Sequence, residues 1–248
     1  MLDAVITAGG RLSSEAAARF GSDVKALVRV NGKPMIATVV DALRATPGIA
    51  RIAVVGPSAA RSAAGDVDQW IDEFPTGEEN LIAAVGAAKT ERIVMSASDL
   101  PFVTPASYVS LIEKTAPDVD AGYPVFGRDE FLRAYPRGRK HFAALADGEW
   151  TGASAFVLNR SPLVRDDRMM RRAFGARKSL FALASLLGPV LLFKFVFKTL
   201  TLADVEERAG SLLGAKVRAV RGADPALAMD CDDPIDFAYA HADEAKLG

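Results

Sequence analysis

The stretch that decides the fold is Asp3-Ala-Val-Ile-Thr-Ala-Gly-Gly-Arg11, followed by Arg19-Phe-Gly-Ser-Asp-Val-Lys25. The apolar run at residues 4–6 predicts a buried strand, which ends at the paired glycines Gly9 and Gly10. Without a Cβ atom, the backbone at these glycines turns tightly and approaches a ligand closely. Peptide N–H groups in such a turn bind anions, and nearby arginine and lysine side chains add positive charge. The stretch therefore predicts a phosphate-binding turn at the end of the first strand.

Strands and helices alternate along the first half of the chain. Residues 51–56 and 92–98 have the apolar composition of buried strands. Apolar residues at helical spacing lie around them, at residues 35–44, 80–89 and 105–114. Such alternation predicts helices packed on a parallel sheet, in which ligands bind at the carboxyl ends of the strands. The glycine turn and Asp99 are therefore expected at the same edge of the sheet.

From Asp120 onward the alternation becomes irregular. Strands are predicted there at 121–126, 131–135, 152–158, 217–220 and 226–229. Helices are predicted at 168–187, 190–200 and 202–213, with a last helix after Asp236. The whole pattern predicts an α/β fold of three layers, α/β/α, around a mixed, mostly parallel sheet. We expect one domain over residues 1–248.

Composition limits the possible functions. The 248 residues are 50% hydrophobic and 25% charged with a net charge of −1, which is typical of a globular protein and gives no reason to expect a nucleic-acid partner. The single cysteine, Cys231, excludes an intrachain disulfide framework and a cysteine-built zinc site. No basic segment followed by an apolar signal core is visible at the N-terminus, so we expect a cytoplasmic protein.

One region, residues 180–198, is strongly apolar. Its run at 180–193 is shorter than the ~20 residues that span a bilayer and is interrupted by Gly188 and Pro189, so we do not expect it to cross a membrane. Two hypotheses remain open. The region forms core or homodimer helices, or it makes a peripheral membrane contact assisted by its basic neighbours, which are Arg171, Arg172, Arg177, Lys178, Lys194 and Lys198.

Five motifs occur in an order that resembles a known family. They are Ala8-Gly9-Gly10, Arg19-Phe20-Gly21 with Lys25, Ser98-Asp99-Leu100-Pro101, Thr151-Gly152-Ala153 and Asp230-Cys-Asp-Asp-Pro-Ile-Asp236. The chain resembles the nucleotidyltransferases with the nucleotide-diphospho-sugar transferase (Rossmann-like) fold, especially those similar to molybdenum cofactor guanylyltransferase. The loop between Gly10 and Arg19 is longer than the family's usual spacing. Whether Arg11 or Arg19 takes the role of the signature arginine therefore stays open, although the sequence context favours Arg19.

The resemblance implies Mg²⁺-dependent transfer of a nucleoside monophosphate from a nucleoside triphosphate to a small phosphorylated acceptor, with release of pyrophosphate. It implies a nucleotide-binding half at 1–118 and an acceptor-side half at 119–248, the latter containing the apolar helices at 168–200. The implied catalytic residues are Lys25, Arg19 and Asp99, and the implied nucleotide-binding residues are Ala8, Gly9, Gly10, Arg11, Gly77 and Asn80. Thr151 and Gly152 are implied for the acceptor. Magnesium is implied at Asp99, Asp232 and Asp230.

Two other functions remain open. Asp230-Cys-Asp232 has the Asp-x-Asp pattern of glycosyltransferases that share this fold and use nucleotide sugars. The long loop after Gly10 and the alanine at position 153 are compatible with a nucleotide-binding regulatory module that has lost turnover. In an extended segment, Asp230 and Asp232 share one side, so Cys231 is expected to point into the core.

Overall fold

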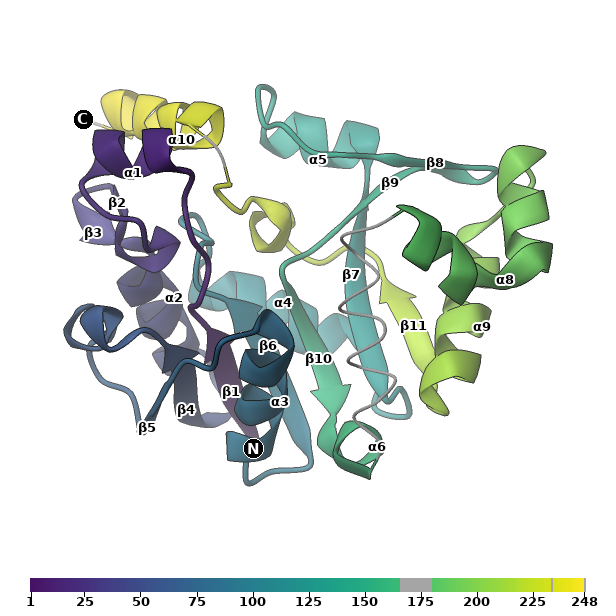
Figure 1. Ribbon diagram of the computed structural model, residues 1–248, viewed down its shortest axis with the longest axis horizontal. Helices are drawn as coiled ribbons and strands as arrows, with labels where there is room; N and C mark the ends of the chain where they lie inside the picture. The colour runs from purple at the N-terminus through teal and green to yellow at the C-terminus, as the bar shows by residue number, and fades with distance from the viewer. Residues whose placement is uncertain (166–179, 233, 248) are drawn as a thin grey trace.

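The computed structural model describes residues 1–165, 180–232 and 234–247 (Figure 1). Within them one sheet has the strand order β5-β4-β1-β6-β10-β7-β9-β8, and β11 pairs with β7 on the edge opposite β10. Its strands are β1 (Leu2–Thr7), β4 (Ile49–Gly56), β5 (Gln69–Asp72), β6 (Arg92–Ala97), β7 (Ala121–Gly127), β8 (Ala143–Leu145), β9 (Gly148–Gly152), β10 (Ala155–Asn159) and β11 (Val217–Val220). The strands from β5 to β6 pair in parallel, whereas β10 is antiparallel to both β6 and β7. The predicted mixed, mostly parallel sheet is confirmed.

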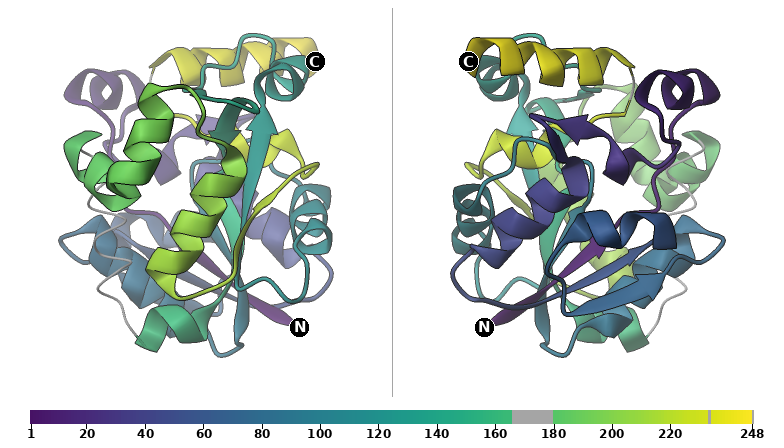
Figure 2. Two further views of the ribbon diagram at one scale, coloured as in Figure 1. Left: turned by 90° about the vertical axis from the view of Figure 1, so that its right-hand side faces the viewer. Right: turned by 90° about the vertical axis from the view of Figure 1, so that its left-hand side faces the viewer.

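Helices cover both faces of the sheet (Figures 1 and 2). They are α1 (Ser14–Phe20), α2 (Met35–Arg44), α3 (Gly77–Ala87), α4 (Pro105–Lys114), α5 (Arg128–Ala134), α6 (Arg160–Arg165), α8 (Leu180–Val196), α9 (Leu202–Leu213) and α10 (Pro234–Leu247). In Figure 2 the helices α3 and α9 lie on one side of the strands, and α2 and α4 lie on the other. This arrangement confirms the three-layer α/β/α architecture.

The sequence of β1 explains why it lies at the centre. Ala4 and Ile6 pack into the larger core on the side of α2 and α4, whereas Val5 packs into a second core on the side of α3. All three side chains are completely buried. Because neighbouring residues of a strand face opposite sides, an uninterrupted apolar run is what a strand between two helical layers requires. The apolar run identified in the sequence is thus the central strand.

Short-range turn and cap signals in the sequence also explain local structure. Asn31 and Gly32 adopt positive φ angles of 52° and 69° in the two-residue turn between β2 (Arg29–Val30) and β3 (Lys33–Pro34). The side chain of Ser13 accepts the N–H of Ala16 at the start of α1. At the start of α9, Thr201 and Asp204 form a reciprocal capping box.

Three predicted strands in the second half are wrong in whole or in part. Residues 131–135 lie mostly in α5, because the three residues before Phe131 complete a helical turn and Glu130 accepts the N–H of Gly127 at its start. Residues 226–229 lie mostly in the 3₁₀ helix η4 (Pro225–Ala228), because Asp224 caps it by accepting the N–H of Ala226. The predicted strand at 152–158 is divided between β9 and β10.

The apolar helical region is partly described. The prediction at 168–187 falls largely on residues 166–179, which lie outside the described residues. Residues 180–196 form α8, which is interrupted at Gly188 with φ 77°. The end of the region carries exposed apolar side chains, which are those of Val190, Leu192, Phe193, Phe195, Val196 and Phe197. No helix among the described residues is long and apolar enough to cross a membrane.

Gly122 in β7 is needed for close packing, and this leads to a stability prediction. A Cβ atom at this position would lie 2.4 Å from Thr115 Cγ2 and 3.0 Å from Val220 Cγ2. Both neighbours are β-branched and stiff, so Gly122→Ala is expected to lower the free energy of unfolding by about 1–3 kcal/mol.

Gly86 provides the matched control for this substitution. It is an exposed position in α3 with no neighbouring atom within 4 Å of an added Cβ. Gly86→Ala is therefore expected to raise stability by about 0.5–1 kcal/mol. Urea unfolding of both variants measures the difference, and equal effects would contradict the packing argument.

Candidate active site

Backbone hydrogen bonds join three distant segments at the edge of the sheet where β1 and β6 end. The N–H of Ala97 donates to the carbonyl of Ser154 at 2.8 Å, and the N–H of Ser154 donates to the carbonyl of Leu227 at 2.9 Å. The N–H of Cys231 donates to the carbonyl of Asp99 at 3.1 Å. These bonds place the segment after η4 beside the end of β6, so Asp230 and Asp232 reach the same edge as Asp99.

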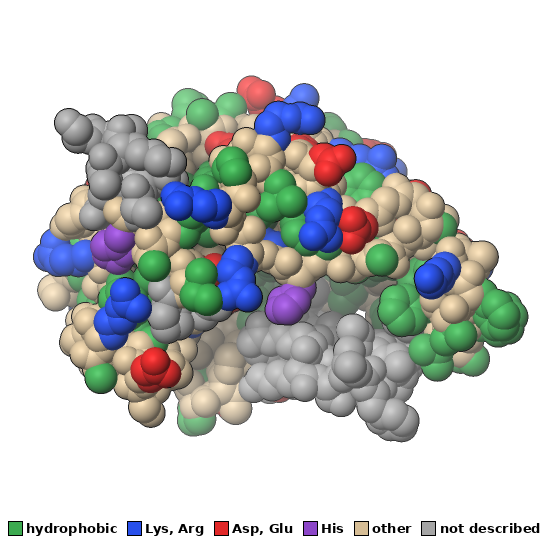
Figure 3. Space-filling model, turned by 90° about the horizontal axis from the view of Figure 1, so that it is seen from above, with side chains coloured by type: hydrophobic (Ala, Val, Ile, Leu, Met, Phe, Trp, Pro, Cys, Tyr) green, Lys and Arg blue, Asp and Glu red, His purple; other side chains and the backbone are tan. Residues whose placement is uncertain are grey.

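A polar cavity of about 830 Å³ opens at this edge. Its walls come from the glycine turn, the segment before α3, the end of β6 and the segment after η4. The lining residues include Gly9, Gly10, Arg11, Lys25, Glu73, Gly77, Asn80, Ser98, Asp99, Ser154, Asp230 and Asp232. Figure 3 looks onto this side of the molecule, where Lys and Arg side chains are spread over the surface. The expectation that the glycine turn and Asp99 share one edge is confirmed.

The paired glycines leave room for functional side chains. A Cβ atom on Gly10 would lie 3.1 Å from Lys25 Cδ, and one on Gly9 would lie 3.0 Å from Asn80 Nδ2. The carbonyl of Gly10 also accepts the N–H of Lys25. The turn thus fixes the position of Lys25. Ala8 is buried beneath the turn and donates its N–H to Val55, so it supports the cavity from below.

Lys25 lies between two carboxylates. Its Nζ pairs with Asp232 Oδ1 and is 3.8 Å from Asp99 Oδ2. The Asp99 side chain is 15% exposed, whereas that of Asp232 is 58% exposed. Burial raises the pKa of Asp99 above its usual range, Lys25 opposes this rise, and the charge of Asp232 adds to it. A cation and two carboxylates therefore form one electrostatic unit in the cavity wall.

The structure separates the two candidate arginines. Arg11 lines the cavity, donates to the carbonyl of Gly9 at 3.0 Å and pairs with Glu73. Arg19 lies in the last turn of α1, where its guanidinium stacks over the ring of Phe20 at 5.5 Å. It is not among the residues that line the cavity. Most of the long loop between them is folded as α1 (Ser14–Phe20), and this helix places Arg19 outside the cavity.

Gly77 and Asn80 lie in the first turns of α3 and line the cavity, with Asn80 next to Gly9. Asn80 is buried, and its Oδ1 accepts the N–H of Phe74 at 2.6 Å. Thr76 caps the helix through a reciprocal pair with Glu79. The amide of Asn80 therefore holds the segment that precedes α3, and this segment forms one side of the cavity.

A second cavity of about 540 Å³ contains the two residues predicted for the acceptor. Thr151 and Gly152 line it from β9, and a Cβ atom at 152 would lie 2.5 Å from Tyr123 Oη. Ser154, Asp230 and Asp232 line both cavities. The two cavities therefore meet at these three residues.

Lys140 is a site residue that the sequence analysis missed. Its Nζ pairs with Asp230 Oδ1, and Asp230 Oδ2 accepts the hydroxyl hydrogen of Ser154 at 3.0 Å. Burial lowers the pKa of Lys140, and the charges of Asp232, Asp236 and Asp99 oppose that shift. The available signal was the basic run Arg137-Gly-Arg-Lys-His141, which has no fixed spacing to the other motifs. Glu73 was missed in the same way.

Cys231 confirms the predicted alternation of the segment after η4. Its side chain is completely buried, whereas Asp230 and Asp232 line the cavities on the other side. Burial raises the pKa of the Cys231 thiol, which keeps it neutral. The cysteine therefore belongs to the core, and the two carboxylates belong to the site.

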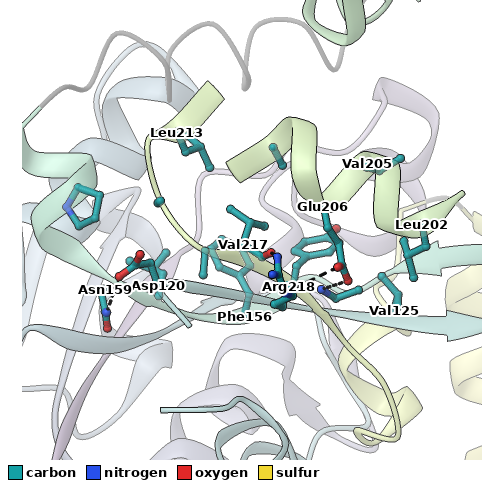
Figure 4. A pocket seen from close by; sticks show the side chains of 18 of the residues that line it. Asp120, Val125, Phe156, Asn159, Leu202, Val205, Glu206, Leu213, Val217 and Arg218 are labelled. Carbon is teal, nitrogen blue, oxygen red and sulfur yellow. Dashed lines mark hydrogen bonds and ion pairs between the residues drawn. The ribbon is translucent and has the colours of Figure 1, made fainter. Parts of the chain in front are cut away.

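A third cavity, of about 500 Å³, differs in chemistry (Figure 4). It lies between α9 and the strands β7, β10 and β11, and apolar side chains such as Val205, Leu213 and Phe156 point into it. Its polar groups are already bonded to one another, as in the 3.0 Å hydrogen bond from Asn159 Nδ2 to Asp120 Oδ1. An apolar wall does not suit a triphosphate, so the polar cavity is the candidate active site.

Comparisons with known proteins agree with this geometry. The family model described as "MobA-like NTP transferase domain" matches residues 4–179. A hypothetical transferase from Thermus thermophilus is similar over 95% of this chain and 99% of its own, with 30% identity and a TM-score of 0.85. Comparison with curated proteins gives no match.

Two further solved structures share the fold at lower identity. A nucleotidyl transferase from Methanothermobacter has 18% identity and a TM-score of 0.58, with coverage of 100% of this chain and 99% of its own. The 2-C-methyl-D-erythritol 4-phosphate cytidylyltransferase from Thermus thermophilus has 15% identity and a TM-score of 0.56, with 98% of each chain covered. Residues 4–179, which the family model matches, include the glycine turn, Lys25 and Asp99. The chain belongs to the family of MobA-like NTP transferase domains and is a nucleotidyltransferase.

Proposed function

We propose that the enzyme transfers a nucleoside monophosphate from a nucleoside triphosphate to a small phosphorylated acceptor and releases pyrophosphate. The observation that carries the proposal is the arrangement of Asp99, Asp232 and Lys25 in the wall of a polar cavity that the glycine turn borders. One of the proteins that share this fold is named as a cytidylyltransferase of 2-C-methyl-D-erythritol 4-phosphate, which is a phosphorylated alcohol. We therefore assign the larger cavity to the nucleotide and the cavity lined by Thr151 and Gly152 to the acceptor.

Charge determines how the triphosphate would lie. Lys25 and Arg11 supply positive charge beside Gly9 and Gly10, which suits the phosphates. Gly77 and the segment held by Asn80 form the adjoining wall, which we assign to the nucleoside. The α-phosphorus would then lie near the residues shared by the two cavities.

The carboxylates fit a magnesium ion that arrives with the nucleotide. Mg²⁺ at such sites commonly takes one or two protein carboxylates and completes its coordination with waters and phosphates. Asp99 and Asp232 meet on one side of the cavity, and no group of three candidate ligands gathers among the described residues. These two residues would hold the ion, with Asp230 as the neighbouring third candidate. When bound, Mg²⁺ would withdraw charge from the phosphate oxygens.

The reaction needs no nucleophile from the protein. An oxygen of the acceptor attacks the α-phosphorus and forms a new P–O bond, and the bond to the bridging oxygen of the β-phosphate breaks. The electron pair of that bond leaves with pyrophosphate. The protein's task is therefore to orient both substrates and to stabilise charge on phosphate oxygens, and Lys25 is placed for the second role.

Arg11 and Arg19 offer a direct comparison. Arg11→Ala is expected to weaken binding of the preferred nucleoside triphosphate about tenfold, because a charged hydrogen-bond donor at the cavity is lost. Arg19→Ala is expected to change binding less than twofold, since this side chain stacks on Phe20 outside the cavity. Isothermal titration calorimetry measures both affinities. A larger loss in the Arg19 variant would assign the signature role to Arg19, as the sequence context suggested.

The proposal is tested by measuring pyrophosphate release. The four common nucleoside triphosphates are combined with a panel of sugar phosphates and polyol phosphates, with Mg²⁺ and with EDTA. We expect one triphosphate and one acceptor class to give Mg²⁺-dependent release. Tighter binding of a nucleotide sugar than of any triphosphate would favour the glycosyltransferase hypothesis instead, and nucleotide binding without any product would favour the regulatory one.

Two sequence-based expectations concern the surroundings of the enzyme. We propose a cytoplasmic location, which is supported by a lone, buried cysteine. We also retain the proposed contact through residues 180–198, with a second copy of the chain or with a membrane, because Val190, Phe193 and Val196 are 61–66% exposed. Sedimentation equilibrium and co-sedimentation with anionic vesicles separate the two partners. A monomer that does not bind vesicles would contradict the contact.

A further inference from the structure

We propose that Lys140 is a catalytic cation that binds the phosphate of the acceptor where the two cavities meet, and that Asp230 positions it there. This inference rests on the proposed nucleotidyl transfer and assigns a role to a residue outside the family motifs quoted above. It also gives Asp230 a function other than metal binding.

Lys140 lies where the acceptor cavity meets the nucleotide cavity. It lines the acceptor cavity, and its ammonium pairs with Asp230, which lines both cavities. Ser154 bonds the other oxygen of Asp230, so the carboxylate is held from two sides. In an attack on the α-phosphorus, the acceptor oxygen must cross from one cavity to the other at this place. Lys140 is thus the cation placed beside the reacting atoms on the acceptor side.

Lys140 and Asp230 form an ion pair that is mostly buried. The side chains of Lys140 and Asp230 are only 14% and 16% exposed. Burying an ammonium costs desolvation free energy unless an opposite charge lies close to it. An ion pair that served only solubility would be exposed and would avoid this cost. The chain keeps a cation here although the surroundings are largely removed from water. An anionic ligand that enters the cavity would meet an ammonium that water screens poorly and that Asp230 holds in place.

Arg139 lines the acceptor cavity beside Lys140, whereas two other cations of this region, Arg128 and Arg137, are held on aromatic rings. Arg128 donates to Glu149 at 2.9 Å and lies over the ring of Phe142. Arg137 stacks over Tyr239 at 5.6 Å. Lys25, by contrast, faces Asp99 and Asp232 in the nucleotide cavity. We therefore assign Lys25 to binding the triphosphate and Lys140 to binding the phosphate of the acceptor.

The pairing with Asp230 also has a consequence for the metal. A carboxylate bonded to Lys140 and Ser154 has both of its oxygens engaged, whereas Asp99 and Asp232 lie on either side of Lys25. Asp230 is accordingly a positioning residue in this account. Asp230→Asn is expected to raise the KM for the acceptor while leaving the Mg²⁺ concentration for half-maximal activity within twofold of wild type. Asp99→Asn is expected to raise that Mg²⁺ concentration at least tenfold.

Binding of a simple anion tests Lys140 without knowledge of the acceptor. Glucose 1-phosphate and inorganic phosphate are titrated calorimetrically into the protein loaded with Mg²⁺ and an α,β-methylene nucleoside triphosphate. We expect wild type and Lys216→Met, an exposed control that loses only its pair with Asp118, to bind one of these probes equally. Lys140→Met is expected to bind it at least tenfold more weakly. Equal binding by Lys140→Met, or no phosphate binding by wild type, would overturn the inference.

Restoring the positive charge at position 140 by chemical modification shows whether Lys140 acts through its charge or only supports the structure. Cys231 is completely buried, so a cysteine introduced by Lys140→Cys is the accessible thiol for alkylation. Treatment with 2-bromoethylamine rebuilds a lysine-like cation and is expected to restore phosphate binding and pyrophosphate release at least tenfold. Iodoacetamide, which adds a neutral group, is expected to restore neither, and treated wild type serves as the control. Equal recovery with both reagents would contradict the role of the charge.

These outcomes also distinguish the inference from the proposed function. If wild type binds phosphate through Lys140 but releases no pyrophosphate from any triphosphate, the nucleotidyl-transfer proposal fails and the anion site remains. If wild type releases pyrophosphate and Lys140→Met does so with unchanged kcat and KM, only the role of Lys140 fails.

Discussion

Replacement of Lys25 by methionine is expected to lower the rate of pyrophosphate release by about 10²–10³-fold, or roughly 3–4 kcal/mol of transition-state stabilisation. The ammonium of Lys25 is only 14% exposed and lies between Asp99 and Asp232 at the cavity wall. Methionine keeps most of the side chain's volume but removes the charge. Two carboxylates would then face the triphosphate without their cation, which adds repulsion to the loss of a favourable contact.

Lys33→Met provides the control for this prediction. Lys33 is a lysine on the exposed hairpin of β2 and β3, where it pairs with Asp41 away from the cavity. Its replacement is expected to leave pyrophosphate release within twofold of wild type. Circular dichroism and thermal unfolding show whether both variants are folded. A folded Lys25→Met enzyme with the wild-type rate would remove Lys25 from the mechanism.

Replacement of Phe126 by alanine is expected to lower the free energy of unfolding by about 3–5 kcal/mol. Phe126 is completely buried in β7, where it pairs in register with Thr151 of β9 and belongs to the larger core. Loss of the ring removes buried apolar surface and leaves a cavity that the surrounding sheet closes only in part. For a chain of this size the melting temperature should fall by roughly 6–20 °C.

Phe195 serves as the matched control, because it is the same residue type at an exposed position. Its side chain is 52% exposed at the end of α8. Phe195→Ala is expected to change the free energy of unfolding by less than about 0.5 kcal/mol in the isolated protein. Urea unfolding measures both variants. A small effect at Phe126 would show that the second half of the sheet contributes little to the stability of the fold.

The sequence predicted those parts of the fold that depend on local signals. The apolar run of β1, the Asn31-Gly32 turn and the caps of α1 and α9 are short-range features, and each is present in the structure. In contrast, residues 131–135 and 226–229 have strand-like composition but are helical for most of their length. Their conformation is set by side-chain caps from Glu130 and Asp224, which outweigh weak preferences in short segments.

The site was predictable to the extent that its residues lie next to such signals. Asp99 ends a recognisable strand, and the alternation around Cys231 placed Asp230 and Asp232 on one side. Lys140 was not predictable, because it lies in a loop and reaches the site only through the tertiary approach of that loop to the segment after η4. The distinction between Arg11 and Arg19 likewise depends on α1, which directs the second arginine away from the cavity.

The central claim is that the cavity beside the glycine turn binds a magnesium-loaded nucleoside triphosphate through Asp99. Calorimetric titration of each triphosphate into wild type and Asp99→Asn, with Mg²⁺ and with EDTA, tests it most directly. We expect one triphosphate to bind wild type at least tenfold more tightly with Mg²⁺ than with EDTA, and we expect Asp99→Asn to lose this difference. Triphosphate binding that is equally tight without Mg²⁺, or that keeps its full Mg²⁺ dependence in Asp99→Asn, would contradict it.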